Sequence, residues 1–95
     1  MGEIALTGRL VCQDAEESDL VAGLLPTHIA LTRAEPGCLM FEVAQTSDPL
    51  VWQVEERFES RSAFQLHQKR ATASAWGRLT AEITRDYTVT GLTAE

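Results

Sequence analysis

The stretch LVWQVEERFESRSAFQLHQ, residues 50–68, decides the fold because its apolar residues change spacing partway along it. Over residues 50–59 every second side chain is apolar, apart from Glu56, which is the pattern of a strand with one buried face. From Ser60, a residue type that caps helices well, the spacing becomes helical and His67 falls on the apolar side. The stretch therefore predicts a strand followed by a helix, with an acid and a histidine directed inward.

Other elements follow outward from this unit. The sequence predicts a strand over residues 3–12, a helix from the cap at Asp14 to about Ala34, a strand from Leu39 to the turn at residues 46–49, a second helical stretch over residues 73–81, and a strand over residues 85–92. Pro26 lies inside the first helix and removes a backbone donor there, so a kink or a break is expected near Leu25.

Two faces are predicted in more detail. The first helix should bury an apolar stripe, and the second strand should bury the face that carries its alternate apolar side chains. The stripe consists of Leu20, Val21, Leu24, Leu25, His28 and Leu31, and the buried side of the strand consists of Leu39, Phe41 and Val43.

The resulting order, βαββαβ, predicts an α+β fold. It is the ferredoxin-like, split βαβ arrangement, in which right-handed crossovers give a four-stranded antiparallel sheet of order 4-1-3-2 with both helices on one face. Residues 1–95 should form a single domain, since a chain of this length builds one thin core. The uncovered face, with apolar residues on both faces of several strands, predicts a homodimer joined sheet to sheet.

Composition excludes several classes of function. Eight basic and fourteen acidic residues give a net charge of −6, and the basic residues are scattered, so nucleic acid is not an expected partner. The longest apolar run, residues 20–25, is too short to span a membrane, and the N-terminus lacks the features of a signal peptide, so we expect a cytoplasmic protein. Cys12 and Cys38 have no metal-binding or redox spacing and should be free thiols two strands apart.

Two segments carry a family resemblance. Residues 32–39, TRAEPGCL, and the spacing Glu56-x-Phe58 followed by Ala63-x-x-x-His67 resemble the antibiotic biosynthesis monooxygenase domain family, which includes proteins classed as quinol monooxygenases. The resemblance covers nearly the whole chain. It implies a dimeric α+β barrel of ferredoxin-like subunits. It also implies oxidation of phenolic or quinol-type aromatics by O2 with no flavin, haem or metal, so neither a cofactor nor a metal is expected.

Haem-degrading relatives with the same fold have three marker residues. They resemble one another in an asparagine of the first strand, a tryptophan on the helix and a haem-ligating histidine further along it. The corresponding positions here hold Gly8, His67 and Gly77, so the resemblance does not extend to haem degradation.

The implied reaction defines the groups that the site needs. An electron-rich aromatic reduces O2 far more readily once its hydroxyl has lost a proton, which calls for a base, a donor that stabilises the anion and a dry pocket. His67 is the candidate base because its ordinary pKa lies near neutrality, and Glu56 is the candidate residue that orients it. The alternative is structural: the two side chains join helix and strand by a hydrogen bond.

Further residues are candidates for holding the substrate. Trp76, Trp52, Phe64 and His28 are predicted to bind the aromatic, although large aromatics and a core histidine also fit simple packing. Arg33 and Arg85 are candidates to stabilise a phenolate, and Tyr87 is a candidate donor.

Three functions remain open at this point. The first is a cofactor-independent monooxygenase whose partners are a small quinol-like or polyphenolic aromatic and O2. The second is a non-catalytic dimeric module that binds a small aromatic ligand. The third is a proton-transfer isomerase on the same barrel, which would use the same base without oxygen.

Overall fold

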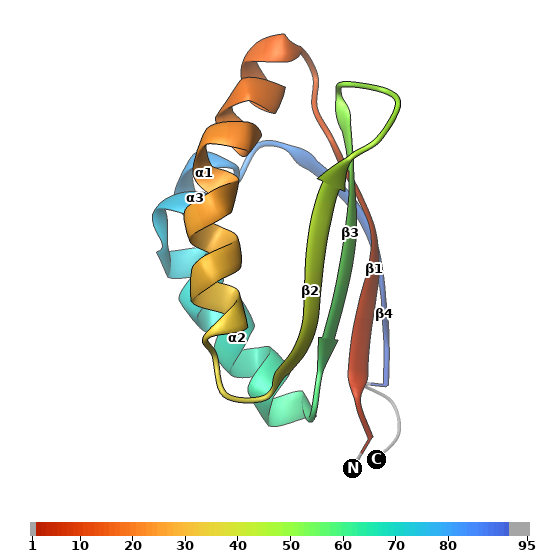
Figure 1. Cartoon of the computed structure of the whole chain (residues 1–95), viewed down its shortest axis with the longest axis vertical. Coiled ribbons are helices and arrows are strands. Elements are labelled where there is room, and N and C mark those ends of the chain that lie inside the picture. Colours follow the sequence, from red (N-terminus) through yellow and green to blue (C-terminus); the bar gives the residue numbers. More distant parts are fainter. Residues whose placement is uncertain (1, 92–95) are drawn as a thin grey trace.

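The computed structural model describes residues 2–91 and has two layers: a sheet, and helices that cover one of its faces (Figure 1). The elements in chain order are β1 (Ile4–Val11), α1 (Ala15–Arg33), β2 (Cys38–Gln45), β3 (Val51–Phe58), α2 (Arg61–Ala73), α3 (Ala75–Leu79) and β4 (Thr84–Thr90). The four strands are antiparallel in the order β2-β3-β1-β4, which confirms the predicted ferredoxin-like topology. The predicted end of the last strand at Leu92 lies outside the described residues.

The predicted change from strand to helix is confirmed at β3 and α2. β3 pairs with β1 on one side and β2 on the other, and it buries alternate residues, Glu56 among them. Ser60 caps α2 by accepting a hydrogen bond from the Ala63 backbone N–H at 3.1 Å. His67, on the buried face of α2, is 2% exposed. An acid and a histidine thus enter the same space from opposite layers.

The helix α1 begins as predicted but does not break at its proline. Asp14 caps it, accepting a hydrogen bond from the Glu17 backbone N–H at 3.0 Å. The helix continues past Pro26 to Arg33, so it does not break into two segments, and the alternative of a kink stays a prediction. Proline costs one internal hydrogen bond there, and the helix buries side chains both before and after it, which hold the two halves on the same sheet.

Two predicted core positions are instead exposed. Leu31 is 48% exposed, because the buried row of α1 consists of Ser18, Val21, Leu25, His28 and Thr32. Leu39 is 50% exposed while Phe41 is 2% exposed. The strand pairing shifts between Cys38 and Met40, an irregularity that breaks the simple alternation at the start of β2.

The helix α3 returns the chain towards α1 after a sharp change of direction. Ser74 is extended, ends α2 and caps α3, accepting a hydrogen bond from the Gly77 N–H at 3.3 Å. A Cβ atom on Gly77 would lie 2.2 Å from the Ala71 carbonyl oxygen, so only glycine allows this close return. The turn carries Trp76 over the space between the helices and the sheet.

The outer face of the sheet is more polar than predicted. Along the two central strands it carries Thr7, Arg9, Gln53, Glu55 and Arg57, beside the apolar Ala5, Val11 and Val51. A polar outer face gives less apolar surface for a sheet-to-sheet contact than expected, and the homodimer stays a prediction.

Two further predictions concern the cysteines and membranes. Cys12 follows β1 directly and Cys38 begins β2; both are free, and β3 lies between β1 and β2, as predicted. Of the helices in residues 2–91, none combines the length and apolar character that a membrane crossing requires.

Candidate functional site

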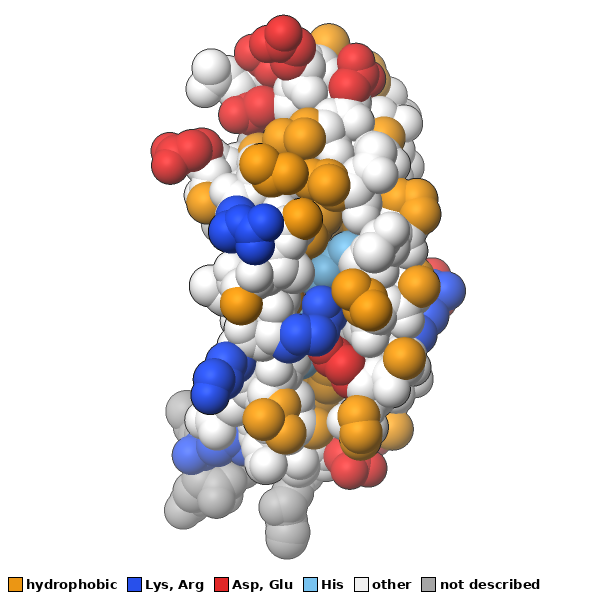
Figure 2. All heavy atoms as spheres, turned by 90° about the vertical axis from the view of Figure 1, so that its left-hand side faces the viewer, with side chains coloured by type: hydrophobic (Ala, Val, Ile, Leu, Met, Phe, Trp, Pro, Cys, Tyr) orange, Lys and Arg blue, Asp and Glu red, His pale blue; other side chains and the backbone are white. Residues whose placement is uncertain are grey.

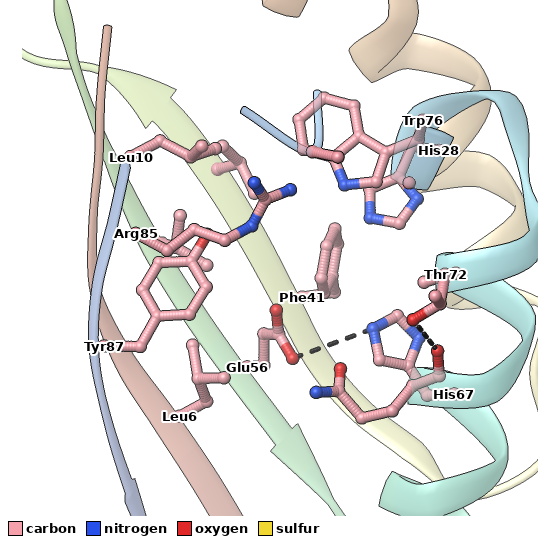
Figure 3. Close-up of a pocket in the computed structure, with 16 residues that line it drawn as sticks. Leu6, Leu10, His28, Phe41, Glu56, His67, Thr72, Trp76, Arg85 and Tyr87 are labelled. Carbon is pink, nitrogen blue, oxygen red and sulfur yellow. Dashed lines mark hydrogen bonds and ion pairs between the residues drawn. The ribbon is translucent and has the colours of Figure 1, made fainter. Parts of the chain in front are cut away.

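A cavity of about 320 Å³ lies between the helices and the sheet. Its volume is at the lower end of the range for small-molecule sites, which is roughly 300 to 1,000 Å³. Apolar side chains from β1, β2 and β3 form its floor, and α1, α2, α3 and β4 supply the remaining walls (Figure 3). The labelled lining residues in that view are Leu6, Leu10, His28, Phe41, Glu56, His67, Thr72, Trp76, Arg85 and Tyr87.

His67 is held from behind by Glu35. The distance between His67 Nδ1 and Glu35 Oε1 is 2.9 Å, and Glu35 Oε2 accepts a hydrogen bond from Arg70 Nε. Arg70 is itself fixed, since its Nη2 donates to Thr32 Oγ1 at 2.9 Å. A carboxylate only accepts hydrogen bonds, so the proton of a neutral His67 lies on Nδ1 and the lone pair on Nε2.

The turn after α1 places Glu35 against α2. Gly37 has a φ of 89°, and a Cβ atom there would lie 2.6 Å from the Cβ of Ala63. Its carbonyl accepts a hydrogen bond from the Glu59 N–H at 2.8 Å, which ties the turn to the end of β3. The glycine of the EPGC segment thus permits the close approach that brings Glu35 to His67.

Glu56 faces the free nitrogen of His67 across the cavity. Glu56 Oε1 is 3.8 Å from His67 Nε2, within ion-pair range and beyond hydrogen-bonding distance (Figure 3). Glu56 is 6% exposed, and its Oε1 has no hydrogen-bond partner among the described residues. The orienting hydrogen bond that the sequence analysis assigned to Glu56 is therefore made by Glu35.

Burial favours the neutral form of both facing groups. It raises the pKa of Glu56 to about 7, with the negative charge of Glu35 adding to the rise. Burial also lowers the pKa of His67; Glu35 opposes that change and Arg70 adds to it. Near pH 7 the carboxyl group of Glu56 therefore holds a proton in about half of the molecules. Burial favours an imidazole beside it whose Nε2 is unprotonated.

Aromatic rings form the wall next to this pair. His28 stacks on Trp76, with ring centroids 4.5 Å apart and 6° between the planes, and its edge meets Phe41 at 5.3 Å. A second hollow of about 260 Å³ lies on the helix side of this wall, lined in part by Leu24, Leu31, His28 and Trp76. In Figure 2 a histidine is visible at the bottom of a hollow on the helix face. The stacked pair thus separates the outer hollow from the inner cavity.

The strand β4 contributes polar groups on the opposite side. Arg85 Nη1 donates to the Thr80 carbonyl at 2.7 Å, and Nη2 donates to Thr80 Oγ1 at 2.8 Å. Burial raises the pKa of Tyr87 to about 12, so the hydroxyl keeps its proton and remains a donor. Both residues line the cavity, where the sequence analysis had considered them as donors to a substrate oxygen.

The structure brings four of the six predicted site residues together. His67, Glu56, Trp76 and His28 line the cavity, whereas Trp52 and Phe64 do not. Trp52 Nε1 donates to Ser18 Oγ at 3.1 Å, a contact between sheet and helix outside the cavity.

Two other candidates also point elsewhere. Phe64 packs against Phe58 with ring centroids 5.7 Å apart. Arg33 donates to the Phe41 carbonyl at 2.8 Å and forms an ion pair with Glu42, and it does not line the cavity.

Glu35 and Arg70 were missed by the sequence analysis. Glu35 lies in the EPGC segment, so the motif pointed to this part of the chain as a candidate for the site. Its contact with α2 depends on the turn geometry at Gly37, which the motif does not specify. Within residues 2–91, no group of three or more histidine, cysteine or acidic side chains is arranged to hold a metal ion.

This arrangement can accept a proton from a ligand hydroxyl and stabilise the resulting anion. His67 Nε2 offers an acceptor atom, and the carboxyl group of Glu56 offers a donor while it holds a proton. Glu35 stabilises the imidazolium that forms, as a carboxylate does behind any histidine base.

Known structures share this fold. Rv0793 from Mycobacterium tuberculosis is 23% identical, with a TM-score of 0.74 over 99% of this chain and 98% of that one. A candidate antibiotic biosynthesis monooxygenase from Nitrosomonas europaea is 18% identical, with a TM-score of 0.76 over 97% and 91% of the two chains. A conserved protein from Methanosarcina mazei is 18% identical, with a TM-score of 0.74 over 94% and 91%. At these identities the likeness concerns the fold.

Sequence comparison assigns the family. No curated protein matches the chain. The family model described as antibiotic biosynthesis monooxygenase matches residues 11–79, which include the EPGC turn, β3 and α2. The chain therefore belongs to the antibiotic biosynthesis monooxygenase family.

Proposed function

We propose that this protein is a cofactor-independent monooxygenase that oxidises a quinol-like or polyphenolic aromatic with O2. The proposal rests on the position of His67. Its Nδ1 is 2.9 Å from Glu35 Oε1, and its Nε2 faces a cavity lined by aromatic rings. Family membership supports a monooxygenase-type or small-molecule-binding function. The base and the substrate class are our proposal.

His67 acts as the base in the first step. The substrate hydroxyl donates to Nε2 and transfers its proton there as electron density moves into the ring. His67 Nδ1–H already donates a hydrogen bond to Glu35, so the imidazolium is stabilised without any movement of the side chains.

Glu56 stabilises the anion that forms. Its carboxyl group is buried and has a pKa raised to about 7, so below that pH it is mostly protonated. The protonated group donates to the same substrate oxygen. A neutral carboxylic acid in an apolar site is an effective donor to an oxyanion. The distance of 3.8 Å between Glu56 Oε1 and His67 Nε2 means that a single oxygen atom can contact both.

The phenolate then reduces O2. One oxygen atom enters the aromatic, and the other leaves as water with two hydrogen atoms from the substrate. The aromatic itself gives up the four electrons, so no external reductant is needed. His28 and Trp76 stack face to face, and the ring face that the stack leaves open offers a flat surface for a planar aromatic.

The test is O2 uptake by metal-free protein against a panel of hydroquinones and polyphenols, with a protein-free control for autoxidation. We expect uptake to equal product formed, and ¹⁸O2 to place one labelled atom in the product. Saturable binding in air with no uptake across the panel would contradict the proposal and leave a binding module.

A proton-transfer isomerase is the second candidate. The Glu56–His67 pair favours it, because two groups that face each other 3.8 Å apart can remove a proton and return it at another atom. Turnover of the aromatic under nitrogen, with exchange of a ring hydrogen for deuterium, would support this function over oxygenation.

A further inference from the structure

His28 is a buried polar residue on the cavity wall that the proposed proton transfer does not use. It is 5% exposed, and its orientation is fixed by the stack on Trp76 and the edge contact with Phe41. Its Nδ1 atom has no hydrogen-bond partner among the described residues. An unpaired polar atom is unfavourable in a buried position, so a bound ligand is the natural source of a partner.

His28 is not a second base. Burial, together with the charges of His67, Arg70 and Arg85, lowers the pKa of His28 to about 3, so the ring stays neutral. A neutral imidazole offers one donor and one acceptor. It can therefore bind either a hydroxyl or a carbonyl oxygen without accepting a proton from it.

Besides Arg85 and Tyr87 of β4, the cavity lining has two places where a buried polar atom lacks a partner among residues 2–91. The Glu56–His67 pair forms one, and His28 forms the other, with the two imidazole centroids 6.0 Å apart and tilted by 40°. The unpartnered atoms, Glu56 Oε1 and His28 Nδ1, come from the sheet and from α1. A ligand with a single oxygen function satisfies only one of them.

We propose that His28 selects the substrate: its buried nitrogen binds a second oxygen function, so the cavity takes planar aromatics with two oxygen substituents in preference to simple phenols. This inference rests on the proposed function, from which it takes the aromatic ligand and the place of its first oxygen, and it adds the residue that binds the second oxygen. The first oxygen lies at His67 and Glu56, and the second lies at His28 beside the ring of Trp76.

The test compares two ligands of the same ring system under nitrogen, where no oxidation occurs. Binding of 1,4-dihydroxynaphthalene and 1-naphthol is measured by calorimetry. We expect the wild type to bind the diol about tenfold more tightly, the effect of one buried hydrogen bond that the phenol cannot make. In His28→Phe, which keeps an aromatic ring against Trp76, we expect the two ligands to bind within about threefold of each other.

Two further variants separate recognition from packing. His28→Asn returns an amide near the position of Nδ1 and should recover part of the diol preference, and it decides the question if His28→Phe fails to fold. Thr72→Val is the matched control, because the Thr72 hydroxyl lines the cavity but already donates to the Gln68 carbonyl at 2.7 Å. That variant should keep the full preference.

Three results would overturn the assignment. The first is a wild type with no preference for the diol, and the second is an unchanged preference in His28→Phe. The third is an equal loss of affinity for the diol and the phenol in both His28 variants. Failure of the proposed function is distinguishable from these. A diol preference that depends on His28, in a protein that consumes no O2, would keep this inference and remove the monooxygenase. O2 uptake without such a preference would do the reverse.

Discussion

Replacing Glu56 with glutamine should remove the alkaline limit on activity. In the proposed mechanism Glu56 must hold a proton and His67 must lack one, so kcat/KM should fall on both sides of a narrow optimum. The alkaline side reports loss of the Glu56 proton, since burial raises that pKa to about 7. The acid side reports protonation of His67, whose pKa burial lowers from its ordinary value of 6.5.

The size of the effect follows from the titration of one group. For a carboxyl group with a pKa of about 7, the protonated fraction falls about 25-fold between roughly pH 6.5 and pH 8.5. The wild type should lose activity by that factor over this range. The Glu56→Gln amide still donates a hydrogen bond and has no proton to lose, so its kcat/KM should not fall there.

The assay is the initial rate of O2 uptake at low substrate concentration, with autoxidation at each pH subtracted. Glu82→Gln removes an exposed carboxylate and is the control, which should keep the wild-type profile. An alkaline limb that persists unchanged in Glu56→Gln would refute the assignment of Glu56 as the protonated donor.

Three further predictions concern stability and assembly. In the folded protein the pKa of Glu56 is raised from 4.5 to about 7. Its contribution to the free energy of unfolding is therefore fully present below pH 4.5 and is lost as the pH rises through about 7. Urea unfolding should therefore show Glu56→Gln gaining stability relative to the wild type between pH 5 and pH 8, by up to about 3 kcal/mol, and a difference that does not change with pH would contradict this. Glu35→Gln leaves Arg70 without its anionic partner and should cost about 2 kcal/mol in the same assay; because Glu35 raises the pKa of His67, the acid limb of kcat/KM should also move to lower pH. Light scattering should give the mass of a homodimer, and a monomer at high protein concentration would contradict the predicted assembly.

Local patterns were sufficient to predict most of the fold. The alternation of β3, the cap at Ser60 and the helical spacing up to His67 are properties of neighbouring residues, so the sequence contains them directly. The same patterns were wrong at Leu39, and the break that they allowed at Pro26 does not occur. Tertiary packing keeps the helix continuous through Pro26, and an irregular pairing at the start of β2 turns Leu39 outward.

The candidate site was predicted less completely, because it depends on contacts between distant segments. Alternation and helical spacing place Glu56 and His67 in the core, but they do not say which carboxylate bonds the imidazole. That contact forms because the turn at Gly37 approaches α2 closely. Trp52 was a candidate for the cavity wall on the basis of residue type, and its place in β3 directs it to Ser18 instead.

The central claim is that His67 takes the proton of the aromatic hydroxyl. The most direct measurement is the rate of O2 uptake by His67→Gln at saturating aromatic, with the dissociation constant measured under nitrogen on the same sample. The account predicts a fall of at least about 100-fold in rate, the usual contribution of a general base, with binding changed less than about threefold. A folded variant that binds the aromatic and consumes O2 at close to the wild-type rate would contradict it.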